Sequence, residues 1–290
     1  MKVWNREKDQ FIQEKDYGKS KLEFLYNTYI GRILLKTIFA SRWFSKMNGI
    51  YQKSSLSRKK IEKFIKEYEI NMDPYQDIKK YKTFEEFFRR KRDITNGLKK
   101  DSYEKDTLIS IADAKLKIVN LTKNSTFIVK NSIYDLKDLI LDEKLSEEFE
   151  NGICLIYRLT VDDYHRYIFL DSGNVEKQYY IKGKLHTVQS ISDKYKAYIR
   201  NSRNISILNT DNFGKILQVE VGAMLVGKIN NNNIKNFSKF EEKGFFDYGG
   251  STIIQIIKNN NIRIDNKILE MSNEDIEVKV KIGDIIGKRY

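Results

Sequence analysis

The feature that most constrains the fold is a change in the pattern of apolar residues near residue 105. Before it, apolar residues recur at helical spacing among charged ones; after it, the chain runs through short β-branched segments separated by polar turns. The segments that predict strands cover residues 116–119, 153–159, 179–181, 205–208, 216–221, 251–257 and 276–282, with one further helix near 136–149. The sequence therefore predicts an α+β fold, with a helical N-terminal part followed by a mainly antiparallel β part.

Three helical segments are expected before residue 105. In residues 30–38, four apolar residues fall at helical spacing, with Arg32 and Lys36 on the other side. This pattern suits a helix lying in a lipid interface, and equally an amphipathic helix packed on a protein core. A second helix is expected at 57–68, and a capping-box sequence, TFEE at 83–86, starts the third.

The charge balance indicates an anionic partner. Lys and Arg number 53 against 40 Asp and Glu, a formal net charge of +13, which suits nucleic acid or the phospholipid face of a membrane. No N-terminal secretory signal is visible, and no apolar run is long enough to span a bilayer. The only cysteine, Cys154, cannot form an internal disulfide, so a reducing cytosolic compartment is expected.

The segment DYGGSTII at residues 247–254 places a serine between paired glycines and a β-branched strand. Paired glycines are also an ordinary way of entering a strand from a turn. The chain has no Gly-rich phosphate loop, no Cys/His metal cluster and no G-x-S-x-G motif. Its two histidines are His165 and His186, so any imidazole catalyst is one of them, although a lone histidine beside a strand is more often structural.

Six short motifs give this serine a context. They are FEEFFRR at 84–90, IADAK at 111–115, DYHRY at 163–167, FGK at 213–215, VGAMLVG at 221–227 and GGST at 249–252. In this order they resemble the phosphatidylserine decarboxylase proenzymes, and the resemblance covers nearly the whole chain. Each motif alone is a weak signal, but six in order are a strong one.

The resemblance implies a self-processing enzyme. Cleavage between Gly250 and Ser251 would give chains 1–250 and 251–290, held together as a heterodimer, with Ser251 converted to an N-terminal pyruvoyl group. That covalent cofactor, with no metal, would convert phosphatidylserine to phosphatidylethanolamine and carbon dioxide through a Schiff base. Because Gly250 has no side chain, strained backbone geometry is expected there, which lets the Ser251 hydroxyl reach the preceding carbonyl.

The same resemblance implies a location and a domain division. Residues 1–75 would be a helical membrane-associating region and residues 76–290 the catalytic domain. The protein would bind peripherally to the cytoplasmic face of the cell membrane. Its basic surface would then contact anionic lipids and not nucleic acid.

The histidines depart from the family pattern. Many members carry a second histidine three residues after the one in Tyr-His-Arg, thought to be the base for self-cleavage; here that position is Ile168. His186 instead stands in a Leu-His-Thr-Val segment, where those members have Phe or Tyr. The hypothesis is that Asp113 orients His186, which accepts the Ser251 proton in an Asp-His-Ser relay. His165 is then expected to act in decarboxylation, by positioning the substrate or donating a proton.

Two other classes of function stay open. A nonenzymatic protein that binds nucleic acid or a membrane, the latter as a degenerate, unprocessed homologue, would explain the charge but would not need the GGST motif. A pyruvoyl decarboxylase of a soluble amino acid would process itself but have no use for apolar, basic N-terminal helices. Ile111 and Ser202 are smaller departures from the family pattern, from which inactivity does not follow.

Overall fold

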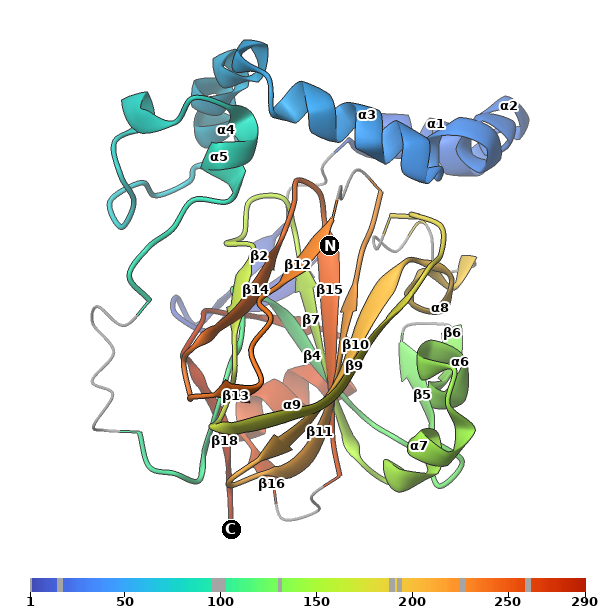
Figure 1. Cartoon of the computed structure of the whole chain (residues 1–290), viewed down its shortest axis with the longest axis vertical. Helices are drawn as coiled ribbons and strands as arrows, with labels where there is room; N and C mark the ends of the chain where they lie inside the picture. The colour runs from blue at the N-terminus through green and yellow to red at the C-terminus, as the bar shows by residue number, and fades with distance from the viewer. Residues whose placement is uncertain are drawn as a thin grey trace.

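The computed structural model describes residues 2–14, 18–94, 103–129, 132–187, 191, 195–224, 228–258 and 262–290. Within these residues, a layer of helices lies across one end of a body built from strands (Figure 1). The predicted α+β class with mostly antiparallel sheets is confirmed.

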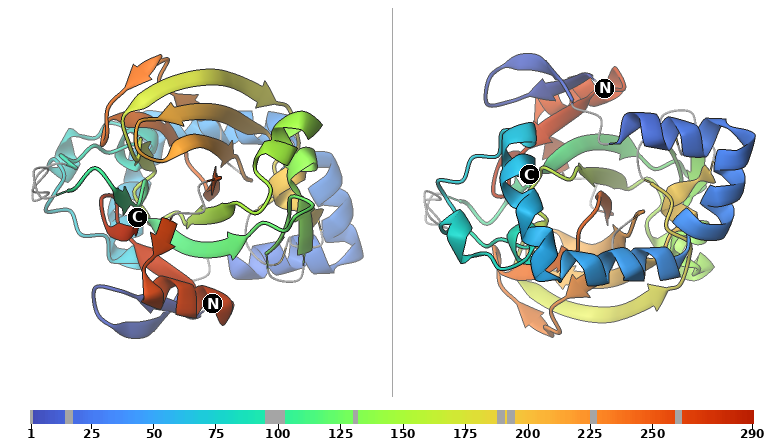
Figure 2. Two further views of the ribbon diagram at one scale, coloured as in Figure 1. Left: turned by 90° about the horizontal axis from the view of Figure 1, so that it is seen from below. Right: turned by 90° about the horizontal axis from the view of Figure 1, so that it is seen from above.

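A ten-stranded sheet forms most of the body. Its order is β13 (Asn236–Phe237), β9 (Gly173–Ile181), β10 (Arg203–Thr210), β11 (Gly214–Val221), β15 (Ser251–Ile257), β7 (Ile153–Leu159), β4 (Ala114–Asn120), β17 (Glu277–Val280), β1 (Lys2–Asn5) and β2 (Gln10–Gln13). Neighbouring strands are antiparallel except β1 and β17, which are parallel. Seen end on, the strands curve around a common interior (Figure 2).

Three smaller sheets complete the body. They are β12 (Ile229–Asn231) with β14 (Glu242–Phe246) and β8 (Arg166–Ile168), β16 (Ile262–Ile264) with β18 (Ile285–Arg289) and β3 (Thr107–Ile109), and β5 (Thr126–Val129) with β6 (Ser132–Asp135). The first of these positions the site. His165 directly precedes β8, the DYGG segment directly follows β14, and the Phe246 N–H donates to the His165 carbonyl at 3.0 Å.

β15 is the central strand and is buried along its whole length. Its isoleucines suit a strand packed on both faces, because β-branched side chains fit the pleated surface. β7 pairs with it over residues 251–257 and β11 over residues 252–257. Each buried isoleucine contributes roughly 1.5–3 kcal/mol of hydrophobic stabilisation, so this strand ties the C-terminal segment firmly into the body.

The helical elements precede the strands of the body or connect them. They are α1 (Lys19–Asn27), α2 (Tyr29–Leu34), the π-helix η1 (Leu35–Phe39), α3 (Arg42–Gln52), η2 (Ser55–Lys59), α4 (Lys60–Tyr68), η3 (Ile78–Lys80), α5 (Phe84–Phe88), α6 (Leu136–Ile140), α7 (Glu143–Glu148), α8 (Ala197–Arg200) and α9 (Asn266–Asn273). The expected cap of α5 is present, because Thr83 Oγ1 accepts the Glu86 N–H at 3.2 Å. Gly31 lies within α2, and a Cβ there would lie 2.0 Å from the Phe24 carbonyl oxygen of α1, so the close approach of these two helices requires glycine.

The start of the chain differs from the expected helical region. Residues 2–13 form β1 and β2, and β1 pairs with β17 near the other end of the chain. So short a run predicts no strand by itself, because its partner is remote in sequence. The helix expected near 136–149 is two helices, α6 and α7, separated by Leu141 with a φ of 55°. The three consecutive asparagines at 259–261 predict an exposed turn, and they lie outside the described residues.

The apolar stripe at residues 30–38 combines two environments. Leu35 is 1% exposed and packs in a cluster with Leu25 and Tyr26, whereas Ile30 is 64% and Ile33 47% exposed. This segment thus packs on the protein through one side and presents apolar side chains on another. No described helix is long and apolar enough to cross a bilayer.

Candidate active site

Ser251 begins β15 and is fully buried, with 0% exposure. Among the described residues, neither its Oγ nor the Oγ1 of Thr252 has a hydrogen-bond partner. An unsatisfied buried hydroxyl costs about 1–3 kcal/mol, so a native fold that keeps one needs a reason for it. A nucleophile held ready for reaction is such a reason.

The turn before Ser251 is strained at Gly249. Its φ of 137° lies in a region that L side chains rarely adopt. Strained geometry was expected at Gly250, whereas the positive φ is one residue earlier, at Gly249. Glycine at position 249 therefore lets the chain turn from β14 into β15.

Helix α5 holds this turn from the outside. Arg89, at its C-terminal end, donates to Asp247 Oδ1 from Nη2 at 2.5 Å and from Nε at 3.1 Å. The Tyr248 ring packs edge-on against Phe84 and Phe88, with centroid distances of 5.2 and 5.1 Å. Through these contacts, the FEEFFRR motif fixes the position of the segment that leads to Ser251.

His165 is a neutral imidazole beside the same turn. Its Nδ1 lies 3.0 Å from the Asp163 carbonyl oxygen, which can only accept, so Nδ1 carries the proton and Nε2 has a free lone pair. Nε2 has no hydrogen-bond partner in the part of the chain that the structure describes, and the centroid of the Phe88 ring lies 4.4 Å from that of the imidazole. Burial lowers the pKa of His165 to about 3, and the backbone of Gly249 is close enough to oppose this shift. The ring is thus uncharged at neutral pH, with the Nε2 lone pair directed away from the Asp163 carbonyl.

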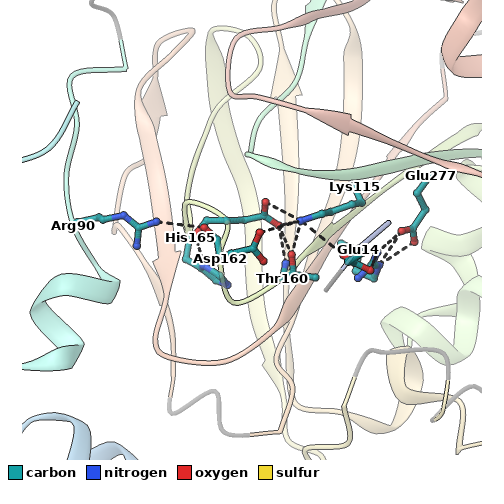
Figure 3. A network of polar contacts seen from close by, with 9 residues as sticks. Glu14, Arg90, Lys115, Thr160, Asp162, His165 and Glu277 are labelled. Carbon is teal, nitrogen blue, oxygen red and sulfur yellow. Dashed lines mark hydrogen bonds and ion pairs between the residues drawn. The ribbon is translucent and has the colours of Figure 1, made fainter. Parts of the chain in front are cut away.

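The loop that carries His165 is fixed by a buried ion pair (Figure 3). Lys115 Nζ lies 2.7 Å from Asp163 Oδ2, which also accepts the Thr160 N–H at 2.7 Å. Burial raises the pKa of Asp163 to about 6, and the attraction of Lys115 opposes the shift. These contacts hold the Asp163 carbonyl where it sets the tautomer of His165.

A second buried cluster joins this loop to both ends of the chain. Arg158, on β7, pairs with Glu277 on β17 at 2.5 Å and with Glu14 at 3.0 Å (Figure 3). Lys115 Nζ lies 3.8 Å from Glu14 Oε1. Glu14 therefore ties the segment after β2 to the strands that support the site.

Arg166 links the His165 loop to α5. Its Nη2 and Nε donate to the Arg89 carbonyl at 2.6 and 3.0 Å, and its Nη1 lies 2.9 Å from Glu242 Oε1. The last carbonyls of a helix lack intrahelical partners, so this arginine satisfies one of them. It also fixes α5 against β14, next to the strained turn.

His186 lies under the helical layer. Its Nδ1 is 3.4 Å from the Tyr26 hydroxyl on α1, and its ring stacks on Tyr195 with centroids 5.0 Å apart. Asn201 donates to the carbonyls of His186 and Gly222, each at 2.8 Å, which brings His186 to the end of the sheet where β15 begins. Burial and neighbouring positive charges lower the pKa of His186 to about 4.

Asp113 has other partners than the sequence reasoning expected. Its Oδ1 accepts from Arg92 Nη2 at 2.6 Å and from the Ile282 N–H at 2.9 Å. No contact joins Asp113 to His186 or Ser251 among the described residues. The relay of Asp113, His186 and Ser251 is therefore not assembled in this uncleaved chain, because arginine and a backbone donor satisfy the aspartate.

Three supporting residues were not assigned a role from the sequence: Lys115, Arg89 and Arg166. Each lies inside one of the six motifs, so their presence in these motifs was the available signal. An open recess of about 390 Å³, lined by residues that include Thr210 and Asp211, lies at the opposite end of β10 from the site.

The fold and the site place a fully buried serine, whose hydroxyl has no partner among the described residues, directly after a glycine turn and near a neutral imidazole. Comparison with known proteins specifies the family. A profile described as phosphatidylserine decarboxylase matches residues 83–288. The chain is 50% identical over 287 residues to phosphatidylserine decarboxylase proenzyme 2 of Clostridium acetobutylicum, covering 99% of this chain and 98% of that protein.

Two further relatives are similar along their full length. The phosphatidylserine decarboxylase proenzyme of Clostridium perfringens is 38% identical over 295 residues, covering 100% of each chain. That of Clostridium tetani is 39% identical over 296 residues, covering 100% of this chain and 99% of that protein. The chain belongs to the phosphatidylserine decarboxylase family.

Proposed function

We propose that this chain cleaves itself between Gly250 and Ser251 and then decarboxylates phosphatidylserine to phosphatidylethanolamine. The observation that carries the proposal is the unpartnered Oγ of fully buried Ser251, directly after a turn with Gly249 at positive φ. The proenzyme names of the relatives support it.

In the cleavage step, Ser251 Oγ attacks the Gly250 carbonyl carbon and the amide becomes an ester. The hydroxyl must lose its proton, and the free Nε2 of His165 is a base held beside the turn. Elimination then breaks the bond between Cβ and the ester oxygen, which leaves a carboxylate on Gly250. The resulting dehydroalanine tautomerises to an imine, and addition of water followed by loss of ammonia converts this new N-terminus to the pyruvoyl group.

The surroundings of Ser251 fit this group, because β15 holds the residue buried between two strands with its Oγ committed to no other contact. A pyruvoyl carbonyl there would supply the electron acceptor for the release of carbon dioxide. His165 would hold or deliver a proton at Nε2, and the Phe88 ring packed on the imidazole would exclude water.

The two products of cleavage would remain one body. Residues 251–290 supply the central strand β15, which pairs with β7 and β11, and β17, which pairs with β4 and β1. Separating the chains would expose the isoleucines of β15. This pairing supports the proposed heterodimer.

We also propose that the helical layer binds the cytoplasmic face of the cell membrane peripherally. Most of the exposed large apolar side chains that the structure describes lie in its first helices: Phe24, Tyr29, Ile30, Ile33, Ile38, Trp43, Met47, Ile50, Tyr51 and Leu56. Exposed basic residues, among them Arg32 and Lys36, lie in the same segment. Apolar side chains flanked by cations suit insertion into an anionic lipid surface.

Intact-mass analysis tests the proposal. The wild-type protein should contain a chain ending at Gly250 and a chain of residues 251–290 with a ketone at its N-terminus, whereas Ser251→Ala should stay whole. A wild-type protein consisting only of the whole 34.4 kDa chain would instead support the unprocessed, membrane-binding alternative. Carbon dioxide release from lipid vesicles compared with free serine distinguishes the lipid substrate from a soluble amino acid.

A further inference from the structure

Among the described residues, Arg90 carries a buried positive charge without a carboxylate partner. It is 2% exposed; within this part of the chain its Nε and Nη1 have no hydrogen-bond partner, and Nη2 reaches the Asp162 carbonyl at 3.4 Å. The neighbouring arginines differ in this respect, because Arg89 pairs with Asp247 and Arg92 with Asp113. A buried cation with unpaired donors is costly, so its retention indicates that a partner arrives at another stage.

The guanidinium is held in a fixed orientation beside the site. The rings of Tyr75 and Phe87 lie 4.9 and 5.0 Å from it, which restrains the planar group and leaves donors on its edge free. Arg90 extends from the end of α5 toward the loop of Asp162 and His165 (Figure 3). Its charge is near enough to lower the pKa of His165. An anion on Arg90 would therefore lie next to the imidazole.

We propose that Arg90 binds the phosphodiester of the substrate headgroup, an inference that rests on the proposed function. A phosphodiester presents paired oxygens that match the free edge of a guanidinium. The serine carboxylate is the poorer partner, because its charge disappears as carbon dioxide forms. A cation bound to it would stabilise the ground state more than the transition state. The phosphate keeps its charge throughout, so its binding energy holds the headgroup in place during the reaction.

Self-cleavage gives the headgroup access. Phe87, which covers the guanidinium, belongs to one apolar cluster with Phe84, Phe88 and Tyr248. Tyr248 lies two residues before Gly250, which becomes a free chain end on cleavage. Release of that end loosens the cluster over Arg90.

The test uses glycerophosphoglycerol, a phosphodiester with neither amine nor carboxylate, so that binding does not depend on the carbonyl chemistry. Calorimetry on the cleaved enzyme should show binding that Arg90→Gln weakens about 10- to 100-fold, with Arg90→Lys between the two. Arg263→Gln, which removes an exposed arginine on β16, should bind like the wild type. Uncleaved Ser251→Ala should bind more weakly than the cleaved enzyme.

The possible outcomes separate this inference from the proposed function. A wild-type protein that neither cleaves nor decarboxylates contradicts the proposed function. A cleaved, active enzyme that does not bind the probe, or binds it equally well with Arg90→Gln, overturns the inference. If Arg90→Gln does not fold, Arg90→Lys decides, because loss of the fork geometry should raise the KM for phosphatidylserine with little change in kcat. If uncleaved Ser251→Ala binds glycerophosphoglycerol as tightly as the cleaved enzyme does, access to Arg90 does not depend on cleavage, and that part of the inference is overturned.

Discussion

Arg89 and Asp247 are 158 residues apart in the chain, yet Arg89 Nη2 donates to Asp247 Oδ1 at 2.5 Å. The arginine ends α5, and the aspartate begins the turn that leads to Ser251. Asp247 Oδ1 also accepts from Asn230 Nδ2 at 2.7 Å. The first of the six motifs thus contacts the carboxylate two residues before the last motif, and this contact fixes the geometry of the cleavage segment.

Arg89→Gln and Asp247→Asn should each slow self-cleavage roughly 10- to 100-fold, because a small displacement of the attacked carbonyl costs that much. The double variant should be no slower than the slower single one, since both remove the same contact. A gel time course of newly made protein measures this. The matched control is Arg6→Gln with Asp265→Asn, which removes a more exposed ion pair elsewhere and should leave cleavage unchanged. If the double variant instead slowed self-cleavage by the product of the two single effects, Arg89 and Asp247 would act independently of each other.

Membrane binding should depend on the exposed side chains of α2. Ile30→Glu with Ile33→Glu should weaken co-sedimentation with anionic vesicles at least about tenfold, because each apolar side chain withdrawn from lipid forfeits roughly 1.5–3 kcal/mol. Added salt should weaken the remaining binding. Point substitutions are preferable to deleting residues 1–50, because that deletion would also remove β1 and β2 from the main sheet.

The control for the membrane experiment is Ile128→Glu with Ile133→Glu. These isoleucines are 56% and 59% exposed on β5 and β6, outside the helical layer. They match the test pair in residue type and exposure. An equal loss of vesicle binding in both double variants would show that the effect comes from added negative charge. The proposal that α2 contacts the membrane would then be contradicted.

Much of this arrangement was predictable from local sequence. The runs at 153–159 and 251–257 have the bounds of β7 and β15, because dense β-branched residues fill strands that are buried on both faces. The single strand β1 was not predictable, because its stability comes from pairing with β17 at the far end of the chain. The environments of the histidines were not predictable either. The IADAK motif identifies Asp113, but none of the six motifs contains Arg92, whose guanidinium donates a hydrogen bond to that carboxylate.

Stability should fall as the solution is acidified, in part because of His165. Its pKa is 6.5 in the unfolded chain and about 3 in the folded chain. Between these values the unfolded chain binds a proton that the folded chain excludes, so the free energy of unfolding decreases as pH falls, by at most about 1.4 kcal/mol per pH unit. Denaturant unfolding of Ser251→Ala should show this slope. Adding His165→Gln should reduce it, and an unchanged slope would mean that the imidazole is protonated in the folded protein.

The last prediction separates the two histidines. His165 has a free Nε2 beside the Gly249 backbone, whereas His186 contacts Tyr26 and lacks Asp113 as a partner. We therefore expect His165→Ala to slow both self-cleavage and carbon dioxide release, roughly 100-fold or more, because each step moves a proton.

His186→Ala should cleave more readily than His165→Ala, and Asp113→Asn should affect cleavage through its contact with Arg92. Gel processing and carbon dioxide release, measured in parallel for each variant, test this. Whole chain accumulating in His186→Ala and Asp113→Asn, with normal cleavage in His165→Ala, would contradict the assignment. That result would mean that Asp113 releases Arg92 and forms the relay with His186 before cleavage, and that His165 acts only afterwards, on the substrate.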